Sequence, residues 1–310
     1  MLPILRFFPR WLRTRPATGI RMATVRYDRA VDPSNSSVCM QIAPEAVIAT
    51  VTDRQRVRQF DMAVLRSSSK DIVSRHIFRR GHWEITHPSE MAALAQVKGV
   101  STPMMPHALP DGSPPILLDI GANLGFYTLL FAHYGFRVIA IEPMERNRRL
   151  IQTSLCLNPR LIGRVTLVPV ALVASAKATT SCIVRTAQKG GAGNGELVCG
   201  AAANCSSPRP DFSCNVVTTR TLDSLLEELR PPAISVAKID IEGGECNALR
   251  GGQSLLTRYR PAFIQWEGLH SKVVHCMRHT VRARGYRVGE RHGTDLNTVA
   301  TPREASNHRL

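Results

Sequence analysis

The sequence predicts an α/β domain with a doubly wound, mostly parallel sheet and an antiparallel edge strand. From about residue 114 onward, short apolar runs alternate with amphipathic stretches, a pattern typical of βαβ units. A glycine turn follows the first apolar run, and two short apolar runs close the domain before residue 302. With 310 residues, the chain is long enough to bury the core of such a domain without disulfides or a metal.

The individual elements follow from apolar spacing and from the residues that end helices. Gly135 closes one predicted helix, and Asn158-Pro159 ends the next, because proline cannot continue a helix. Pro169 should disturb the third strand. The predicted strands are 116–120, 137–141, 165–172, 234–241, 262–266, 286–288 and 296–300. The predicted helices are 126–134, 145–157, 221–229, 245–259 and 272–284.

The chain divides into regions of different composition. We expect a basic leader or disordered arm over 1–30, an irregular extension over 31–113, and a short tail over 303–310. Residues 51–65 of the extension have loose helical spacing with many charges. The main domain is expected over 114–302, with a Gly/Cys-rich loop or insertion at about 176–215.

The net charge of +16 lies largely at the two ends of the chain. The first thirty residues hold seven arginines against Asp28, and the residues from Lys272 onward hold eight basic residues against three acidic ones. We interpret this excess as solvated tails and a solvated helix face, although it also suits nucleic acid, an anionic membrane or an acidic substrate.

The N-terminal composition also bears on where the protein resides. The arginine-rich, acid-poor start is compatible with an organelle transit peptide, and otherwise we expect a cytoplasmic protein. Arg6, Arg10 and Arg13 interrupt the apolar stretch that a secretory signal requires. No segment approaches the roughly 18 apolar residues of a membrane span, so a soluble protein is expected once any leader is removed.

Eight cysteines are present, and four of them crowd the Gly/Cys-rich stretch. No C-x-x-C pair occurs, so we expect no metal site. We expect unpaired thiols, with disulfides as the alternative in an oxidising compartment.

The glycine turn favours a sulfonium nucleoside over a dinucleotide. Gly121 allows a sharp turn and Gly125 lets the next helix start close to the sheet. A dinucleotide site would need glycine at the positions of Asn123 and Phe126. Asp119 at the strand end would repel a pyrophosphate but suits a cationic sulfonium with its amino group. We therefore expect S-adenosyl-L-methionine, with the amide of Asn123 available to its polar groups.

A second acidic residue supports this assignment. Glu142 lies 23 positions after Asp119, at the end of the next predicted strand. A carboxylate there can accept hydrogen bonds from both ribose hydroxyls of a nucleoside. The expected cofactor-binding residues are Asp119, Gly121, Ala122, Asn123, Gly125 and Glu142.

Residues 238–245 form a second acidic cluster at the end of a later strand. Alternation places Lys238, Asp240 and Glu242 on one face, so Asp240 should reach the sheet edge that carries the glycine turn. We expect Asp240 and Glu242 to be catalytic, with Asp240 accepting a hydroxyl proton or only positioning the substrate. The alternative is that Glu242 and Glu245 cap the following helix.

Assembled, these segments resemble the FkbM family of methyltransferases. The resemblance covers about residues 81–288, and the second acidic cluster is its most discriminating part. The segments that carry it are Leu118-Asp119-Ile120-Gly121-Ala122-Asn123-Leu124-Gly125-Phe126-Tyr127-Thr128, Ile141-Glu142-Pro143, Thr221-Leu222-Asp223-Ser224-Leu225, Lys238-Ile239-Asp240-Ile241-Glu242-Gly243-Gly244-Glu245, Leu249-Arg250-Gly251-Gly252, Ile264-Gln265-Trp266-Glu267 and the upstream Gly81-His82-Trp83-Glu84.

The resemblance implies a class I methyltransferase-like fold, S-adenosyl-L-methionine as cofactor, and O-methylation of a hydroxyl on a small molecule or glycan. Val170 stands where the family often has Asn, Gly244 where it has Ala, and the cysteine-bearing stretch is longer. Two alternatives stay open: an RNA methyltransferase, which the basic ends motivate, and a non-catalytic binding protein that keeps the fold. Because aromatics make up only 5% of the residues and no RNA-binding module is visible, a nucleic-acid acceptor is the less favoured reading. The acceptor and the oligomeric state stay undetermined.

Overall fold

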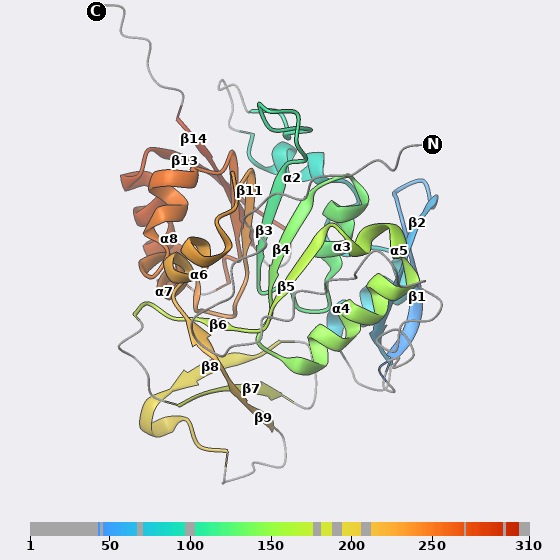
Figure 1. The fold of residues 1–310 in the computed structure, drawn as a ribbon, viewed down its shortest axis with the longest axis horizontal. Coiled ribbons are helices and arrows are strands. Elements are labelled where there is room, and N and C mark those ends of the chain that lie inside the picture. The colour runs from blue at the N-terminus through green and yellow to red at the C-terminus, as the bar shows by residue number, and fades with distance from the viewer. Residues whose placement is uncertain are drawn as a thin grey trace, which may run out of the picture.

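A seven-stranded sheet forms the centre of the molecule in the computed structural model (Figure 1). The structure describes residues 43, 46–66, 71–96, 103–175, 181–187, 194–205, 212–269, 271–293 and 296–303. The strand order is β13-β14-β12-β11-β3-β4-β5. The five strands from β12 to β5 are parallel, and β14 runs antiparallel to both β12 and β13. This confirms the predicted doubly wound sheet with an antiparallel edge.

The sheet is built from short, buried strands whose bounds lie close to the predicted ones. Ile116–Ile120 and Arg137–Ile141 coincide with the prediction, and the third predicted strand divides in two at Val168 and Ala171, beside Pro169. The strands of the sheet are β3 (Ile116–Ile120), β4 (Arg137–Ile141), β5 (Val165–Val168), β11 (Val236–Ile239), β12 (Phe263–Trp266), β13 (Tyr286–His292) and β14 (Asn297–Pro302). A separate two-stranded pair joins β6 (Ala171–Leu172) to β10 (Thr219–Arg220).

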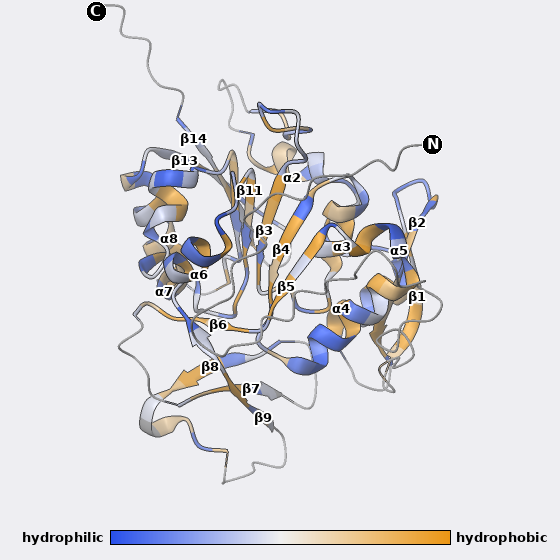
Figure 2. Cartoon of the chain, viewed as in Figure 1, coloured by the Kyte–Doolittle hydropathy of each residue, from blue (hydrophilic) through white to orange (hydrophobic). Residues whose placement is uncertain are grey.

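Helices cover both faces of the sheet and enclose two apolar cores. One core lies under α3 and α4, and the other lies under α6, α7 and α8 (Figure 1). Figure 2 shows the corresponding pattern, with apolar residues along the central strands and mixed hydropathy along the helices. These helices are α3 (Phe126–His133), α4 (Glu145–Leu157), α5 (Pro159–Ile162), α6 (Leu222–Leu229), α7 (Glu245–Arg250) and α8 (Ser271–Ala283).

The predicted helix over 245–259 is interrupted. It ends after α7 at Gly251-Gly252, and a π-helical segment, Leu255–Tyr259, follows. Added Cβ atoms at the two glycines would lie 2.3 Å from the Val173 carbonyl oxygen and 2.6 Å from Leu222. The glycine pair therefore lets the chain pass close to its neighbours, where a continuous helix would not fit.

The region that we expected to be irregular contains regular structure. Ala46–Thr52 (β1) and Arg58–Leu65 (β2) form an antiparallel hairpin, so the loose helical spacing of residues 51–65 was misleading. Two helices follow, α1 (Ile72–Arg80) and α2 (Pro88–Leu94). The hairpin joins the main core, since six of its eight β2 residues are buried.

The Gly/Cys-rich insertion also contains a small sheet. Its described strands are β7 (Cys182–Ala187), β8 (Glu196–Cys199) and β9 (Phe212–Val217), with β7 in the middle. We had expected a loop or insertion here, and its described residues form an antiparallel sheet. Below, we call its described residues 181–187, 194–205 and 212–217 the inserted sheet.

The expectation of unpaired thiols is wrong for the cysteines that the structure describes. Disulfides join Cys182 to Cys199, Cys205 to Cys214, and Cys246 to Cys276, and Cys156 is disulfide-bonded as well. Antiparallel pairing of β7 with β8 places Cys182 directly opposite Cys199. Such pairing brings residues together that sequence spacing alone does not relate.

The described helices show no membrane-spanning candidate: none is both long and apolar enough to cross a bilayer.

Candidate active site

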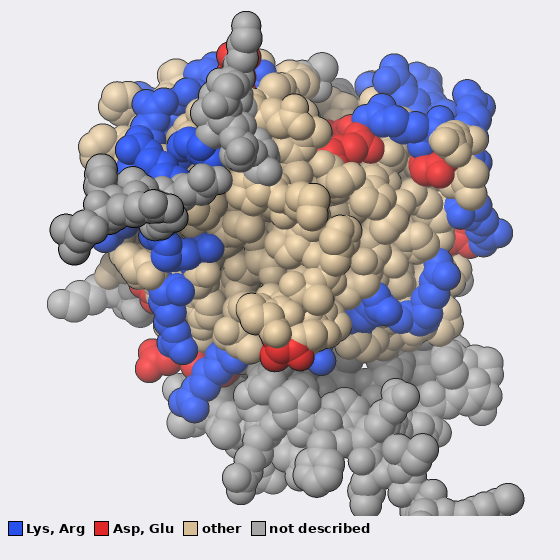
Figure 3. Space-filling model, turned by 90° about the horizontal axis from the view of Figure 1, so that it is seen from above, with Lys and Arg blue, Asp and Glu red and all other residues tan. Residues whose placement is uncertain are grey.

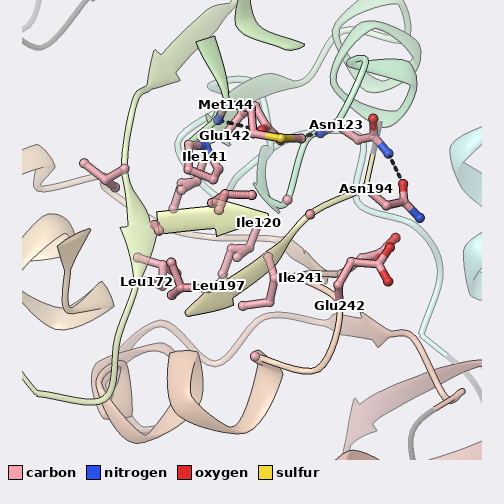
Figure 4. A pocket seen from close by; sticks show the side chains of 18 residues that line it. Ile120, Asn123, Ile141, Glu142, Met144, Leu172, Asn194, Leu197, Ile241 and Glu242 are labelled. Atoms are coloured by element: carbon pink, nitrogen blue, oxygen red, sulfur yellow. Dashed lines mark hydrogen bonds between the residues drawn. The ribbon is translucent and has the colours of Figure 1, made fainter. Parts of the chain in front are cut away.

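The strand order reverses between β3 and β11, and a pocket opens at their carboxyl ends. In doubly wound sheets, ligands bind at this switch point. The pocket encloses about 660 Å³, including its open mouth. Its walls are largely apolar, from residues such as Ile120, Ile141 and Leu172 (Figure 4). We call it the cofactor pocket; its predicted site residues are Gly121, Asn123, Glu142, Asp240 and Glu242.

The turn after β3 requires Gly121. Its φ is +80°, and a Cβ atom there would lie 1.8 Å from the carbonyl oxygen of Asp240. Gly125 has a φ of +93° at the start of α3, where a Cβ atom would lie 2.7 Å from Ile151 on α4. Gly121 therefore allows the sharp turn that we predicted, whereas Gly125 makes room for the Ile151 side chain of α4 and not for the sheet. Gly125 does not line the cofactor pocket.

Glu142 is buried at the end of β4 and is held by two backbone amides. The Asn123 N–H donates to Oε2 at 2.8 Å, and the Met144 N–H donates to Oε1 at 2.9 Å. Burial raises the pKa of Glu142 to about 7, against the lowering effect of these hydrogen bonds. The Asn147 side chain also bonds to this carboxylate. Two carboxylate oxygens offer about four acceptor positions, so the group can still accept a hydrogen bond from a ligand.

Asp119 lies beneath the pocket and does not line it. Its side chain is fully buried at the end of β3, and the Thr128 hydroxyl donates to Oδ2 at 2.6 Å. Burial raises the pKa of Asp119, while the positive charge of Lys238 opposes this rise. Asp119 thus contributes negative charge below the glycine turn.

Lys238 connects the turn to the acidic cluster. Its ammonium group is buried, lies 3.0 Å from Asp240 Oδ2, and donates to the Gly121 carbonyl oxygen at 3.2 Å. Burial disfavours the charged form, but the carboxylates of Asp240 and Asp119 outweigh this effect and raise the pKa of Lys238. Lys238 therefore fixes Asp240 beside the cofactor pocket.

A second cavity adjoins the cofactor pocket and shares Asn123, Asn194, Asp240 and Glu242 with it. It encloses about 820 Å³, including its mouth. Apolar residues from α1 and the segment after it, among them Ile72 and Trp83, form part of its wall. The predicted residue Ala122 lines this cavity. We call it the acceptor cavity.

Acidic side chains concentrate between the two cavities. One oxygen each from Asp240, Glu242 and Glu267 lies within 4.8 Å of the others, a spacing that a cation could bridge. Lys238 already forms an ion pair with Asp240, one of these three acidic residues. Glu245 belongs elsewhere: its buried carboxylate accepts from the Ile241 and Gly243 N–H groups and fixes the loop before α7.

Sequence reasoning missed a polar network behind the acceptor cavity. The Tyr127 hydroxyl donates to Glu84 at 2.7 Å and accepts from the Gln265 amide at 3.0 Å, while the Asn297 amide donates to the second Glu84 oxygen at 2.7 Å. Lys238 lies over the Tyr127 ring, 5.2 Å from its centre. Tyr127 and Glu84 belong to segments that resemble the FkbM family, and this resemblance was the sequence feature that could have pointed to them.

The inserted sheet supplies further pocket residues that no pattern predicted. Val184, Asn194, Gly195 and Leu197 line the cofactor pocket. The Asn123 amide donates to Asn194 Oδ1 at 3.0 Å across the mouth (Figure 4).

The strand order, the glycine turn at the switch point and the acid at the end of β4 define the class I methyltransferase fold. Within that class, the profile of the methyltransferase FkbM domain matches residues 119–288, more than half of the chain. The chain belongs to the FkbM methyltransferase family, as its sequence motifs had indicated. No curated protein matches the chain.

Solved structures of other methyltransferases are distantly similar. A precorrin-6y C5,15-methyltransferase from Geobacter metallireducens has 13% identity and a TM-score of 0.34, covering 61% of this chain and 80% of its own. The human methyltransferase 10 domain containing protein has 14% identity and a TM-score of 0.38, with coverages of 64% and 76%. A Staphylococcus aureus protein assigned by proposal as a caffeoyl-CoA O-methyltransferase has 11% identity and a TM-score of 0.38. The match covers 61% of this chain and 76% of that protein.

Proposed function

We propose that this protein transfers a methyl group from S-adenosyl-L-methionine to a hydroxyl group of a small molecule or glycan. The observation that carries the proposal is the pair of adjoining cavities that share Asp240 and Glu242. One cavity has the features of a nucleoside site, and the other opens onto carboxylates.

The cofactor pocket fits the proposed cofactor in the placement of its polar groups. Glu142 offers acceptors for ribose hydroxyls, and Asn123 Oδ1 is a buried acceptor without a donor among the described residues. When bound, S-adenosyl-L-methionine supplies an activated methyl group on a sulfonium centre.

Asp240 is the proposed base, with Glu242 beside it. Asp240 lies at the boundary of the two cavities and its side chain is 34% exposed, so an acceptor can reach it. Asp240 would accept the proton of the acceptor hydroxyl while the methyl group passes from the sulfonium sulfur to that oxygen, which would leave S-adenosylhomocysteine. Lys238 holds that carboxylate in place.

The charges around the acceptor cavity favour a neutral acceptor over a polyanion. Asp240, Glu242 and Glu267 all line it, and these carboxylates would repel phosphate groups. On the face drawn in Figure 3, Lys and Arg gather towards the edges, and uncharged residues cover the middle. A basic group on α8 and β13 includes Arg278, Arg282 and Arg291, none of which lines either cavity.

Labelled methyl transfer tests the proposal. The protein and S-adenosyl-L-methionine with a radioactive methyl group are incubated with separated glycan, small-metabolite, lipid and RNA fractions. We expect label in the glycan or small-metabolite fraction, and at least a tenfold slower rate for Asp240→Asn, since removal of a general base costs about 10²–10⁴-fold. Label only in RNA, or an undiminished rate for Asp240→Asn, would contradict the proposal.

A further inference from the structure

The inserted sheet forms part of the wall of the cofactor pocket. Val184 on β7, Leu197 on β8 and Gly195 just before β8 line the pocket together with Leu172 and Ile241 of the main domain (Figure 4). The part of the pocket wall that lies on the inserted sheet is apolar apart from Asn194. Its position therefore affects how tightly the pocket encloses a ligand.

The pairing of β7 with β8 places a disulfide beside these pocket residues. Val184 is paired with Leu197, and Cys182 is paired with Cys199 two residues further along. Because side chains alternate between the two faces of a strand, both pairs lie on the same face. The Cys182–Cys199 disulfide thus ties the two strands together next to the Val184–Leu197 pair.

Among the described residues, two side-chain hydrogen bonds join the inserted sheet to the main domain beside the pocket. The Thr186 hydroxyl donates to the Met144 sulfur at 3.3 Å, and the Asn123 amide donates to Asn194. Gly195 packs closely, because an added Cβ atom would lie 2.2 Å from Val184. Within this sheet, β8 is a four-residue edge strand that pairs with β7 alone among the described strands. A covalent link between its strands is therefore important for its shape.

We propose that the Cys182–Cys199 disulfide positions Val184 and Leu197 against the cofactor, so that its reduction weakens cofactor binding. This inference rests on the proposed function, because it takes S-adenosyl-L-methionine as the ligand. Reduction by a dithiol converts the disulfide into two thiols and oxidises the dithiol to its own disulfide. The protein then has its full cofactor affinity in an oxidising compartment, where such disulfides persist.

A pair of matched double variants tests the role of this disulfide. Cys182→Ser/Cys199→Ser removes it. As the control, Cys246→Ser/Cys276→Ser removes the disulfide between α7 and α8; neither Cys246 nor Cys276 lines the cofactor pocket. Binding of S-adenosylhomocysteine is measured by calorimetry without reductant. We expect about tenfold weaker binding or more for the first variant, and a change below about twofold for the second.

Two further measurements keep the test independent of folding. Cys182→Ala/Cys199→Ala is measured in parallel, since alanine suits the buried face of β7 better than serine. Hydrogen exchange of peptides from 181–187 and 194–200 should slow on adding S-adenosylhomocysteine to the oxidised wild type. This protection should be lost in the serine and in the alanine variant of Cys182 and Cys199. Equal affinities of the two serine variants would overturn the inference. Absence of binding to the oxidised wild type would instead refute the proposed function.

Discussion

The ionisation state of Glu142 makes ligand binding in the cofactor pocket depend on pH. Burial raises its pKa to about 7, above the 4.5 of a free carboxyl group. Because the folded-state pKa is the higher one, the protonated form stabilises the fold most below pH 4.5, and this contribution is lost as the pH rises through about 7. The ligand has the opposite preference, since ribose hydroxyls donate to the ionised carboxylate.

We therefore predict that affinity for S-adenosylhomocysteine increases as the pH rises through about 7. Below that value, protonation should weaken binding by up to about tenfold per pH unit. Glu142→Gln should bind weakly and without this pH dependence. Calorimetry between pH 5.5 and 8.5, in about half-unit steps, measures the effect. Glu227→Gln, on an exposed position of α6, is the control and should keep the wild-type profile.

Gly121 is a second residue whose role can be measured, here through stability. Gly121→Ala places a Cβ atom on the Asp240 carbonyl oxygen at a φ of +80°. Gly112 has a φ of +75° with no heavy atom within 4 Å of the added Cβ, so it is a matched control for the strain alone. Gly112→Ala should lower the free energy of unfolding by about 1–2 kcal/mol. Gly121→Ala should lower it clearly more. Urea unfolding measures both, and equal costs would show that the turn does not need close approach to β11.

At the scale of elements, the N-terminal hairpin depends on a few side-chain contacts with the main domain. Asn158, between α4 and α5, donates to the Asp61 carbonyl oxygen at 2.6 Å and accepts from the Asp61 N–H at 3.2 Å. The Ser154 hydroxyl accepts from the Ala63 N–H at 2.9 Å. These bonds attach β2 to the end of α4.

Asn158→Ala should therefore weaken the attachment of the hairpin. It leaves buried backbone groups of β2 without partners, at a cost of about 1–3 kcal/mol in unfolding free energy. Asn247→Ala, on an exposed position of α7, should change it by less than about 0.5 kcal/mol. Hydrogen exchange along β2 should accelerate in the first variant alone. Unchanged exchange would mean that apolar packing by itself holds the hairpin.

For the molecule as a whole, the sequence predicted those parts whose evidence is local. The apolar runs at 116–120 and 137–141 and the helix at 145–157 were predicted with the bounds that the structure has. Their glycine and proline boundaries, and the burial of nearly all residues of the two strands, leave little choice of conformation. The positions of Glu142 and Asp240 at the edge of the sheet could be predicted, because the carboxyl ends of parallel strands meet there; their roles stay predictions.

Features that depend on long-range pairing were not predictable. β2 is buried on both sides, so its residues do not alternate, and the loose spacing of residues 51–65 suggested a helix. The stretch around the inserted sheet contains a glycine run at 190–195 that favoured a loop, and its pocket residues lie about sixty to seventy-five positions after the glycine turn. The Glu84–Tyr127–Asn297 network joins segments from both ends of the chain.

The central claim, that the pocket at the switch point binds S-adenosyl-L-methionine, is tested most directly by calorimetry with S-adenosylhomocysteine and with NAD on oxidised wild-type protein. We predict binding of one S-adenosylhomocysteine per chain, at least about tenfold weaker in Glu142→Gln, and no measurable binding of NAD. Folded protein that binds NAD, or that binds neither ligand, would contradict the claim.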